Sequence, residues 1–200
     1  MSELHISISA QPIFSLGGYE VTNSMLVTVL VSGFLVGLSL AGKHWFNRSQ
    51  KPRWVLFLQT LVESFYAFVM SITPQHAIRF FPLVATIFLF VLFGSWAGLL
   101  PGAESIGLKT VHGFVPLLRG ATADINTTLA LAIFAIVSVQ VFGYKHRGMR
   151  YFKKFLDWSS PINFFVGFLE LISEFSRMIS FAFRLFGNIF AGEVLLAVIA

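Results

Sequence analysis

Residues 170–193 read ELISEFSRMISFAFRLFGNIFAGE, and this stretch decides the fold because it places two arginines and three glutamates inside an otherwise apolar helical pattern. On a helix that turns about 100° per residue, one group of polar side chains gathers within roughly 40° of the direction of Arg184. The group consists of Glu170, Ser173, Arg177, Ser180, Arg184 and Asn188. Glu193 points to the opposite side. The stretch therefore predicts one helix with a polar stripe on one face and a single carboxylate on the other.

The composition predicts an integral membrane protein. Of the 200 residues, 56% are hydrophobic and 12% are charged, and the mean hydropathy is +0.79, whereas about 25% of residues are charged in ordinary globular proteins. Three windows contain no Asp, Glu, Lys or Arg, namely residues 21–42, 80–103 and 125–144. Each window is close to the ~20 residues that a membrane-spanning helix needs.

Several classes of function are disfavoured. The chain has no cysteine, which removes disulfides, thiolate metal sites and cysteine nucleophiles. Its five histidines, His5, His44, His76, His112 and His146, lie outside the three uncharged windows, which argues against haem ligation between spans. No Walker loop, zinc-ligand spacing or nucleophile elbow is present, so we expect no catalysis by this chain alone, no metal and no cofactor. The net charge of +5 resides in loops beside apolar spans, and we expect no binding to nucleic acid.

The distribution of basic residues predicts the orientation. The segment before the first window carries two acids and no Lys or Arg, whereas residues 43–53 carry four Lys or Arg. The positive-inside rule places the N-terminus outside and this loop in the cytoplasm. Residues 145–154 form a second basic loop. If residues 54–73 crossed the membrane, the two basic loops would lie on opposite sides, so we predict that this amphipathic segment lies flat in the interface.

The segment 104–124 is predicted to be an irregular outside loop, because it is rich in Gly and Pro. Within it, Glu104 and Asp124 balance Lys109 and Arg119. Asp124 begins the sequence DINTTLA and suits the N-cap of the following helix. Capping is one interpretation of Asp124, and a functional role is the other.

The last segment predicts a single long helix that starts at Ser160–Pro161. About 40 residues without a strong breaker would span ~60 Å, twice the bilayer core. Such a helix is expected to be steeply tilted or to lie in the membrane plane.

The predicted fold is therefore an all-α integral membrane protein with a single membrane domain. Its expected parts are an outside segment at 1–20, a transmembrane helix at 21–42, an interfacial helix at 54–73, a transmembrane hairpin at 80–103 and 125–144 with the outside loop 104–124 between its helices, and a long tilted helix at 160–200.

Two arginines of the last helix have different local surroundings. Arg184 has no carboxylate three or four residues away, so its counter-charge has to come from elsewhere in the fold, from another subunit or from a lipid headgroup. Arg177 lies three residues after Glu174, and the two side chains are expected to pair along the helix.

The segment RLFGNIFAGE (184–193), with Ser180 and Glu170 before it, resembles the signature of subunit a of the F-type ATP synthase membrane sector. TADINTTLALA (122–132) and the order of helices resemble the same family, so the similarity covers nearly the whole chain. The resemblance implies a stator that conducts protons through two half-channels to a rotating ring of c subunits. It also implies contact with subunit b of the peripheral stalk and with lipid in the bacterial inner membrane.

The resemblance assigns roles to individual residues. It implies that Arg184 faces the ring and prevents a direct leak between the half-channels, and that Asn188 and Ser180 lie on the same face. Glu193 and Asp124 match residues of the outer half-channel. Glu170 and Ser173 match the inner one, to which Glu174 adds.

Three points depart from the resemblance or remain open. Family members continue with a further helix after the position of Ala200, so we expect the chain to be a fragment. The ring, which is not in this sequence, decides between H⁺ and Na⁺ coupling. The alternative function is an ion-coupled secondary transporter in which Arg184 binds an anionic substrate, although such transporters usually have two related halves with broken helices.

Overall fold

The computed structural model is almost entirely helical and describes residues 12–16, 19–46, 52–99, 107–110, 113–116, 119–155 and 160–199. Its five long helices are α1 (Asn23–Phe46), α2 (Arg53–Ile72), α3 (Ala77–Leu99), α4 (Ile125–Arg147) and α5 (Pro161–Ile199). All five are long and apolar enough to cross a membrane. The predicted class, an all-α integral membrane protein, is confirmed, and the chain is a multi-pass membrane protein.

The ends of the helices follow local chemistry. Asp124 caps α4 as predicted, because its side chain accepts a hydrogen bond from the backbone N–H of Asn126. Gly148, with φ of 59°, is the C-cap of α4, a backbone conformation that favours glycine. The predicted start of the last helix at Pro161 is also confirmed.

Some bounds differ from the predicted windows. α1 begins at Asn23 rather than at residue 21, because Val21 and Thr22 belong to strand β2. α3 begins at Ala77, three residues before the predicted window, and accommodates Pro82 inside the helix. α4 continues to Arg147 and includes basic residues that were assigned to the loop. Cations are stabilising there because the C-terminal end of a helix dipole is negative.

Two short antiparallel hairpins were not predicted. Strand β1 (Pro12–Leu16) pairs with β2 (Tyr19–Thr22), and β3 (Gly107–Thr110) pairs with β4 (Gly113–Pro116). The second hairpin and the 3₁₀ turn η2 (Ala121–Ala123) lie in the segment that was expected to be irregular. The prediction was wrong there because strands of four residues are too short to show a periodic pattern.

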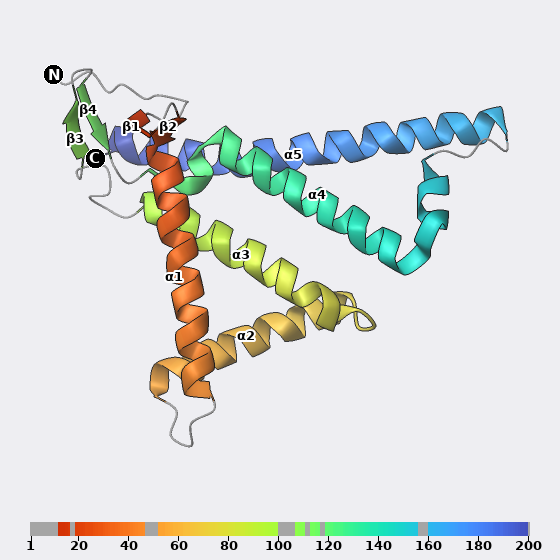
Figure 1. Cartoon of the computed structure of the whole chain (residues 1–200), viewed down its shortest axis with the longest axis horizontal. Coiled ribbons are helices and arrows are strands. Elements are labelled where there is room, and N and C mark those ends of the chain that lie inside the picture. The colour runs from red at the N-terminus through yellow and green to blue at the C-terminus, as the bar shows by residue number, and fades with distance from the viewer. Residues whose placement is uncertain are drawn as a thin grey trace.

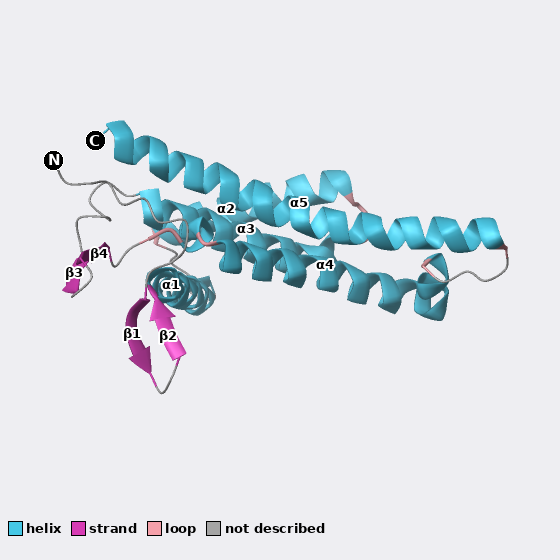
Figure 2. Ribbon diagram, turned by 90° about the horizontal axis from the view of Figure 1, so that it is seen from above, coloured by secondary structure: helices cyan, strands magenta, loops and turns pink. Residues whose placement is uncertain are grey.

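The helices form a frame rather than a parallel bundle (Figure 1). Both views show α2 and α5 running crosswise to α1, which Figure 2 shows end-on. α4 and α5 pack along one another as an antiparallel pair, and α2 and α3 pack as a second pair. The start of α1, the end of α3, the start of α4 and the end of α5 converge on η2.

Few side chains are buried in the part of the chain that the structure describes, as expected for helices that expose apolar side chains to lipid. The main apolar cluster lies near the convergence point, where Val27 and Val31 of α1 pack against Ala121 of η2. Phe90, Phe93 and Ala97 of α3 pack against the same cluster. The best-packed part of the described chain is therefore the end at which η2 lies.

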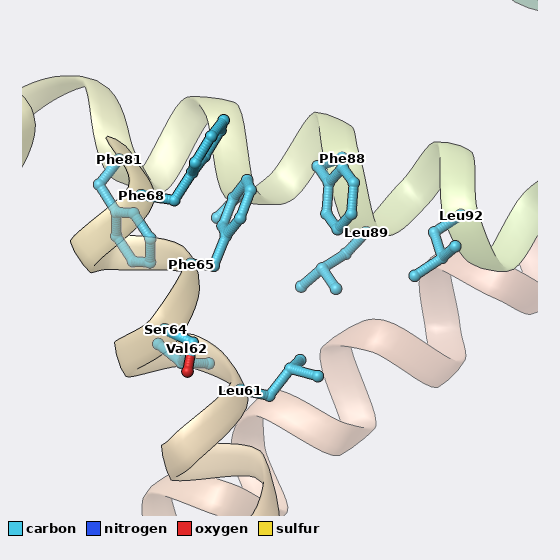
Figure 3. Close-up of a pocket in the computed structure, with 10 residues that line it drawn as sticks. Leu61, Val62, Ser64, Phe65, Phe68, Phe81, Phe88, Leu89 and Leu92 are labelled. Carbon is cyan, nitrogen blue, oxygen red and sulfur yellow. The ribbon is translucent and has the colours of Figure 1, made fainter. Parts of the chain in front are cut away.

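An apolar pocket of about 390 Å³ separates α2 from α3. Figure 3 shows Phe65 and Phe68 of α2 opposite Phe81 and Phe88 of α3. Of the ten residues that line the pocket, only Ser64 has a polar side-chain atom, so the pocket offers a ligand almost no hydrogen bonding. The candidate functional residues lie elsewhere.

Candidate functional site

The convergence point is built around η2, whose three residues have 0% exposure. This turn contacts α1, α3, α4 and α5. A backbone hydrogen bond of 3.0 Å from Ala123 N–H to the Gly120 carbonyl closes it. Small side chains at Ala121 and Ala123 let the four helices approach closely. We call this assembly, formed by η2 and the helix ends around it, the hub.

Asp124 joins two helices at the hub. One carboxylate oxygen, Oδ1, accepts the capping hydrogen bond from Asn126 N–H at 3.1 Å. The other, Oδ2, accepts a hydrogen bond from the Ser24 hydroxyl of α1 at 2.8 Å. Asp124 is only 5% exposed. The interpretation of Asp124 as an N-cap is confirmed, and the structure adds Ser24 as its second partner.

Further hydroxyl groups extend this polar cluster. Thr22 and Ser24 share a hydrogen bond of 3.2 Å, which leads from strand β2 to Asp124. Ser95 of α3 and Thr122 of η2 share another of 2.9 Å. Thr128 is fully buried and donates to backbone carbonyls at the start of α4. Since buried polar groups need hydrogen-bond partners, these contacts fix the helix ends relative to one another.

Glu193 reaches the hub from α5. Its Oε2 lies 4.0 Å from Nε of Arg119, and the two side chains are 12% and 11% exposed. The backbone of Gly98 in α3 and of Gly120 lies directly beside Oε1, because a Cβ on either glycine would come within 2.8 Å or 2.7 Å of that oxygen. Arg119 and Asp124, which were predicted to lie in the outside loop, are both nearly buried at the hub.

Arg184 has the opposite environment. Its side chain is exposed, and its guanidinium carbon lies 5.9 Å from the ring centroid of Phe181. Ser173, Ser180 and Asn188 are exposed on α5 as well. On the reverse side of the same helix, Ala182 is only 1% exposed. The predicted separation of Arg184 and Glu193 onto different faces is therefore found in the structure.

The other charged residues of α5 form a local pair. Arg177 donates to Oε2 of Glu174 at 3.0 Å, so the predicted pairing along the helix is confirmed. Glu174 is 8% exposed and belongs to the buried face rather than to the exposed stripe. Glu170 is half-buried.

A histidine pair at the other end of α4 was not predicted. Nε2 of His76, in the turn between α2 and α3, lies 2.7 Å from Nε2 of His146 in the last turn of α4. The ring centroids are 4.7 Å apart. Such a contact requires one ring to donate and the other to accept. Sequence periodicity carries no signal for a pair that is so distant along the chain.

Comparison with known proteins relates most of the chain to one family. Residues 22–200 match the family model described as "ATP synthase A chain". A protein named ATP synthase subunit a from Geotalea daltonii is 36% identical over 145 residues, which cover 71% of this chain and 56% of that protein.

Two further proteins with the same name align over more of the chain. The Legionella pneumophila protein is 33% identical over 178 residues, which cover 88% of this chain and 69% of that protein. The Gloeobacter violaceus protein is 36% identical over 181 residues, which cover 88% and 67%, respectively. This chain thus spans between 56% and 69% of the length of these three relatives.

Proposed function

Because the chain belongs to the ATP synthase A chain family, we propose that it is the proton-conducting stator subunit of the membrane sector of a rotary ATP synthase. The chain supplies translocation, and nucleotide chemistry occurs on other subunits. Its proposed partners are the ring of c subunits, the subunit b stalk and membrane lipid. The observation that carries the proposal is the placement of Arg184 on the exposed face of α5 while Glu193 of the same helix is nearly buried at the hub.

The proposed outer half-channel is the polar cluster of the hub. Glu193 exchanges protons between the outer water and a ring carboxylate, and Asp124 with its hydroxyl partners forms the neighbouring wall. Glu193 and Asp124 are far apart in the sequence, and the resemblance matched both to the outer half-channel. The proposal is supported because both residues lie close to η2. A nearly buried carboxylate that lies beside an arginine and the backbone of two glycines is poised to bind and release a proton.

The proposed barrier is Arg184. Its guanidinium is a cation, and it attracts each ring carboxylate that has lost its proton. The exposed position of Arg184, beside exposed Ser180 and Asn188, leaves it accessible to a ring that packs against this face. Glu170 and Ser173, with Glu174, form the proposed inner half-channel toward the other end of α5.

The proposed membrane arrangement has the N-terminus and the hub outside and the basic loops in the cytoplasm, with α2 flat in the interface. The contact between Ser24 and Asp124 supports it. If α2 crossed the bilayer, the start of α1 and the start of α4 would lie on opposite membrane faces, and these side chains would not meet. α2 also runs crosswise to α1 in both views.

The test of the function is Arg184→Ala in the assembled synthase. We expect ATP synthesis driven by a proton gradient to be abolished while passive proton flux through the membrane sector persists, because the barrier between the half-channels is lost. Synthesis and flux are measured in the same reconstituted vesicles. Each proton that crosses 100 mV releases about 2.3 kcal/mol, and protons that leak past the ring release this energy without driving synthesis.

The matched control is Arg147→Ala. This arginine is exposed at the far end of α4 and has no place in the proposed path, so coupled synthesis is expected to continue. Normal synthesis by Arg184→Ala would refute the stator function. Uptake of an anionic solute that Arg184→Ala abolishes would instead support the transporter alternative.

A further inference from the structure

Arg119 is a nearly buried cation at the hub to which the proposed function has so far given no role. We propose that Arg119 is a positioning residue for proton transfer by Glu193. Its guanidinium holds the Glu193 carboxylate in place and makes the release of a proton from Glu193 to the outer water easier. This inference rests on the proposed function, because it gives a role only to a Glu193 that exchanges protons.

The first support is the distance and burial of the pair. Nε of Arg119 lies 4.0 Å from Oε2 of Glu193, and about nine tenths of each side chain is shielded from solvent. Surface ion pairs contribute little because water screens them. At the hub less water intervenes, so the attraction between these charges is stronger than at a protein surface.

The second support is the shape of the space around the carboxylate. A Cβ on Gly98 would lie 2.8 Å from Oε1 of Glu193, and one on Gly120 would lie 2.7 Å from it. The two glycines also touch each other, since the Gly98 Cβ would lie 2.5 Å from the backbone of Gly120. The Glu193 carboxylate therefore has the closely packed backbone of Gly98 and Gly120 beside Oε1 and the guanidinium of Arg119 beside Oε2. Its position is defined from two sides.

The third support is the rigidity of the residue that follows Arg119. Gly120 is buried, and its carbonyl accepts the hydrogen bond that closes η2. The turn itself is fully buried among four helices. The side chain of Arg119 therefore extends from a fixed backbone position. A cation placed in this way acts on Glu193 without the entropy cost of ordering a loop.

The charges around Glu193 determine what Arg119 does. In the direction of ATP-driven pumping, a proton arrives from a ring carboxylate on the neutral acid form of Glu193 and leaves for the outer water, so that Glu193 becomes a carboxylate. A nearby cation stabilises the carboxylate and thereby favours this release. In the part of the hub that the structure describes, the other titratable group is Asp124, whose two oxygens already accept hydrogen bonds from Ser24 and Asn126. Glu20 of β2 is exposed.

The test measures ATP-driven proton pumping into inverted membrane vesicles that contain the assembled synthase. Arg119→Gln is expected to pump roughly tenfold more slowly, the effect of removing one opposite charge beside a carboxylate. Raising the pH of the vesicle interior, which receives the protons, should restore part of the rate. Arg119→Lys keeps the charge and is expected to pump within about twofold of the wild type. Arg147→Gln, which removes an exposed cation at the far end of α4, is the control and should pump normally.

A double variant separates this role from simple packing. In a Glu193→Gln background, Arg119→Gln should cause no further loss, because the charge on which it acts is gone. Assembly is measured as the amount of the subunit that copurifies with the synthase. Arg119→Met, which keeps an apolar stem, replaces Arg119→Gln if the latter does not assemble.

Three outcomes would overturn the proposal. The first is that Arg119→Gln pumps at the same rate as the wild type. The second is a loss of rate that does not depend on interior pH and adds to the loss caused by Glu193→Gln. The third is that both uncharged variants fail to assemble while Arg119→Lys assembles. The Arg184→Ala result identifies which idea has failed. If Arg184→Ala uncouples synthesis but Arg119→Gln pumps normally, the stator function holds and the role of Arg119 does not.

Discussion

A methyl group on Gly120 would meet the flexible end of a side chain, Oε1 of Glu193, whereas one on Gly98 would meet backbone at 2.5 Å. The carboxylate can move aside, but the backbone of Gly120 cannot. Two neighbouring glycines of the hub are therefore expected to respond differently to the same substitution.

For Gly120→Ala we expect an assembled subunit with slowed proton pumping, because the Glu193 carboxylate is displaced. For Gly98→Ala we expect a loss of roughly 1–3 kcal/mol of stability, the usual effect of overpacking, and reduced assembly. Gly94→Ala is the matched control. Its Cβ would lie 3.4 Å from Ala121 Cβ, an ordinary contact, so assembly and pumping should be normal.

The measurements are the amount of subunit in the purified synthase and the rate of ATP-driven pumping per assembled complex. Equal behaviour of the Gly98 and Gly120 variants would contradict the geometry around Glu193. Impaired assembly in Gly94→Ala would show that α3 tolerates no added methyl group at this end.

Among the elements, α1 is attached to the start of α4 through the hydrogen bond from Ser24 to Asp124. Ser24→Ala would leave a buried carboxylate oxygen without this donor, which is expected to destabilise the protein by about 1–3 kcal/mol. The change should lower the temperature at which the purified complex loses this subunit in detergent.

Ser138→Ala is the control for this prediction. Ser138 lies on α4, and its hydroxyl donates to the Phe134 carbonyl of its own helix. Its removal should change stability by less than about 0.5 kcal/mol. If the two alanine variants dissociate at the same temperature, the bond to Asp124 contributes no more stability than an ordinary hydroxyl within a helix.

The elements that the sequence predicted well are those with a local signal. The uncharged windows located α1, α3 and α4, and Asp124 marked the start of α4. The pairing of Glu174 with Arg177 follows from their spacing of three residues. In each case, the residues that determine the structure lie within a few turns of one another.

What the sequence could not show depends on distant contacts. Arg119 lies in a loop and Glu193 lies in the last helix, and neither segment contains a sequence signal that predicts their contact. The contact between Gly98 and Gly120 depends on how α3 meets η2. The composition of residues 104–124 suggested an irregular outside loop, and only the packing of four helices around η2 shows why its last residues are buried.

At the scale of the whole molecule, the proposed flat arrangement of α2 determines which loops would share a membrane face. The chain has no cysteine, so single cysteines can be placed at Glu20, Pro52 and Met149 and labelled with a membrane-impermeant thiol reagent. We expect the cysteine at Glu20 to react from outside and those at Pro52 and Met149 to react only from the cytoplasmic side. Reaction of the Pro52 and Met149 variants from opposite sides would mean that α2 crosses the bilayer.

The continuity of α5 has a further consequence. Arg184 and Glu193 belong to one unbroken helix of 39 residues, so peptide geometry alone sets their axial offset at roughly 13–14 Å and their angular offset at about 180°. In the proposed function, a rotor that passes this helix meets the two charges at a constant angular offset, whatever loops or lipids surround it. One residue inserted between them would advance Glu193 by about 100°, away from the two glycines, so that the proposed outer water path would no longer be aligned with the rotor.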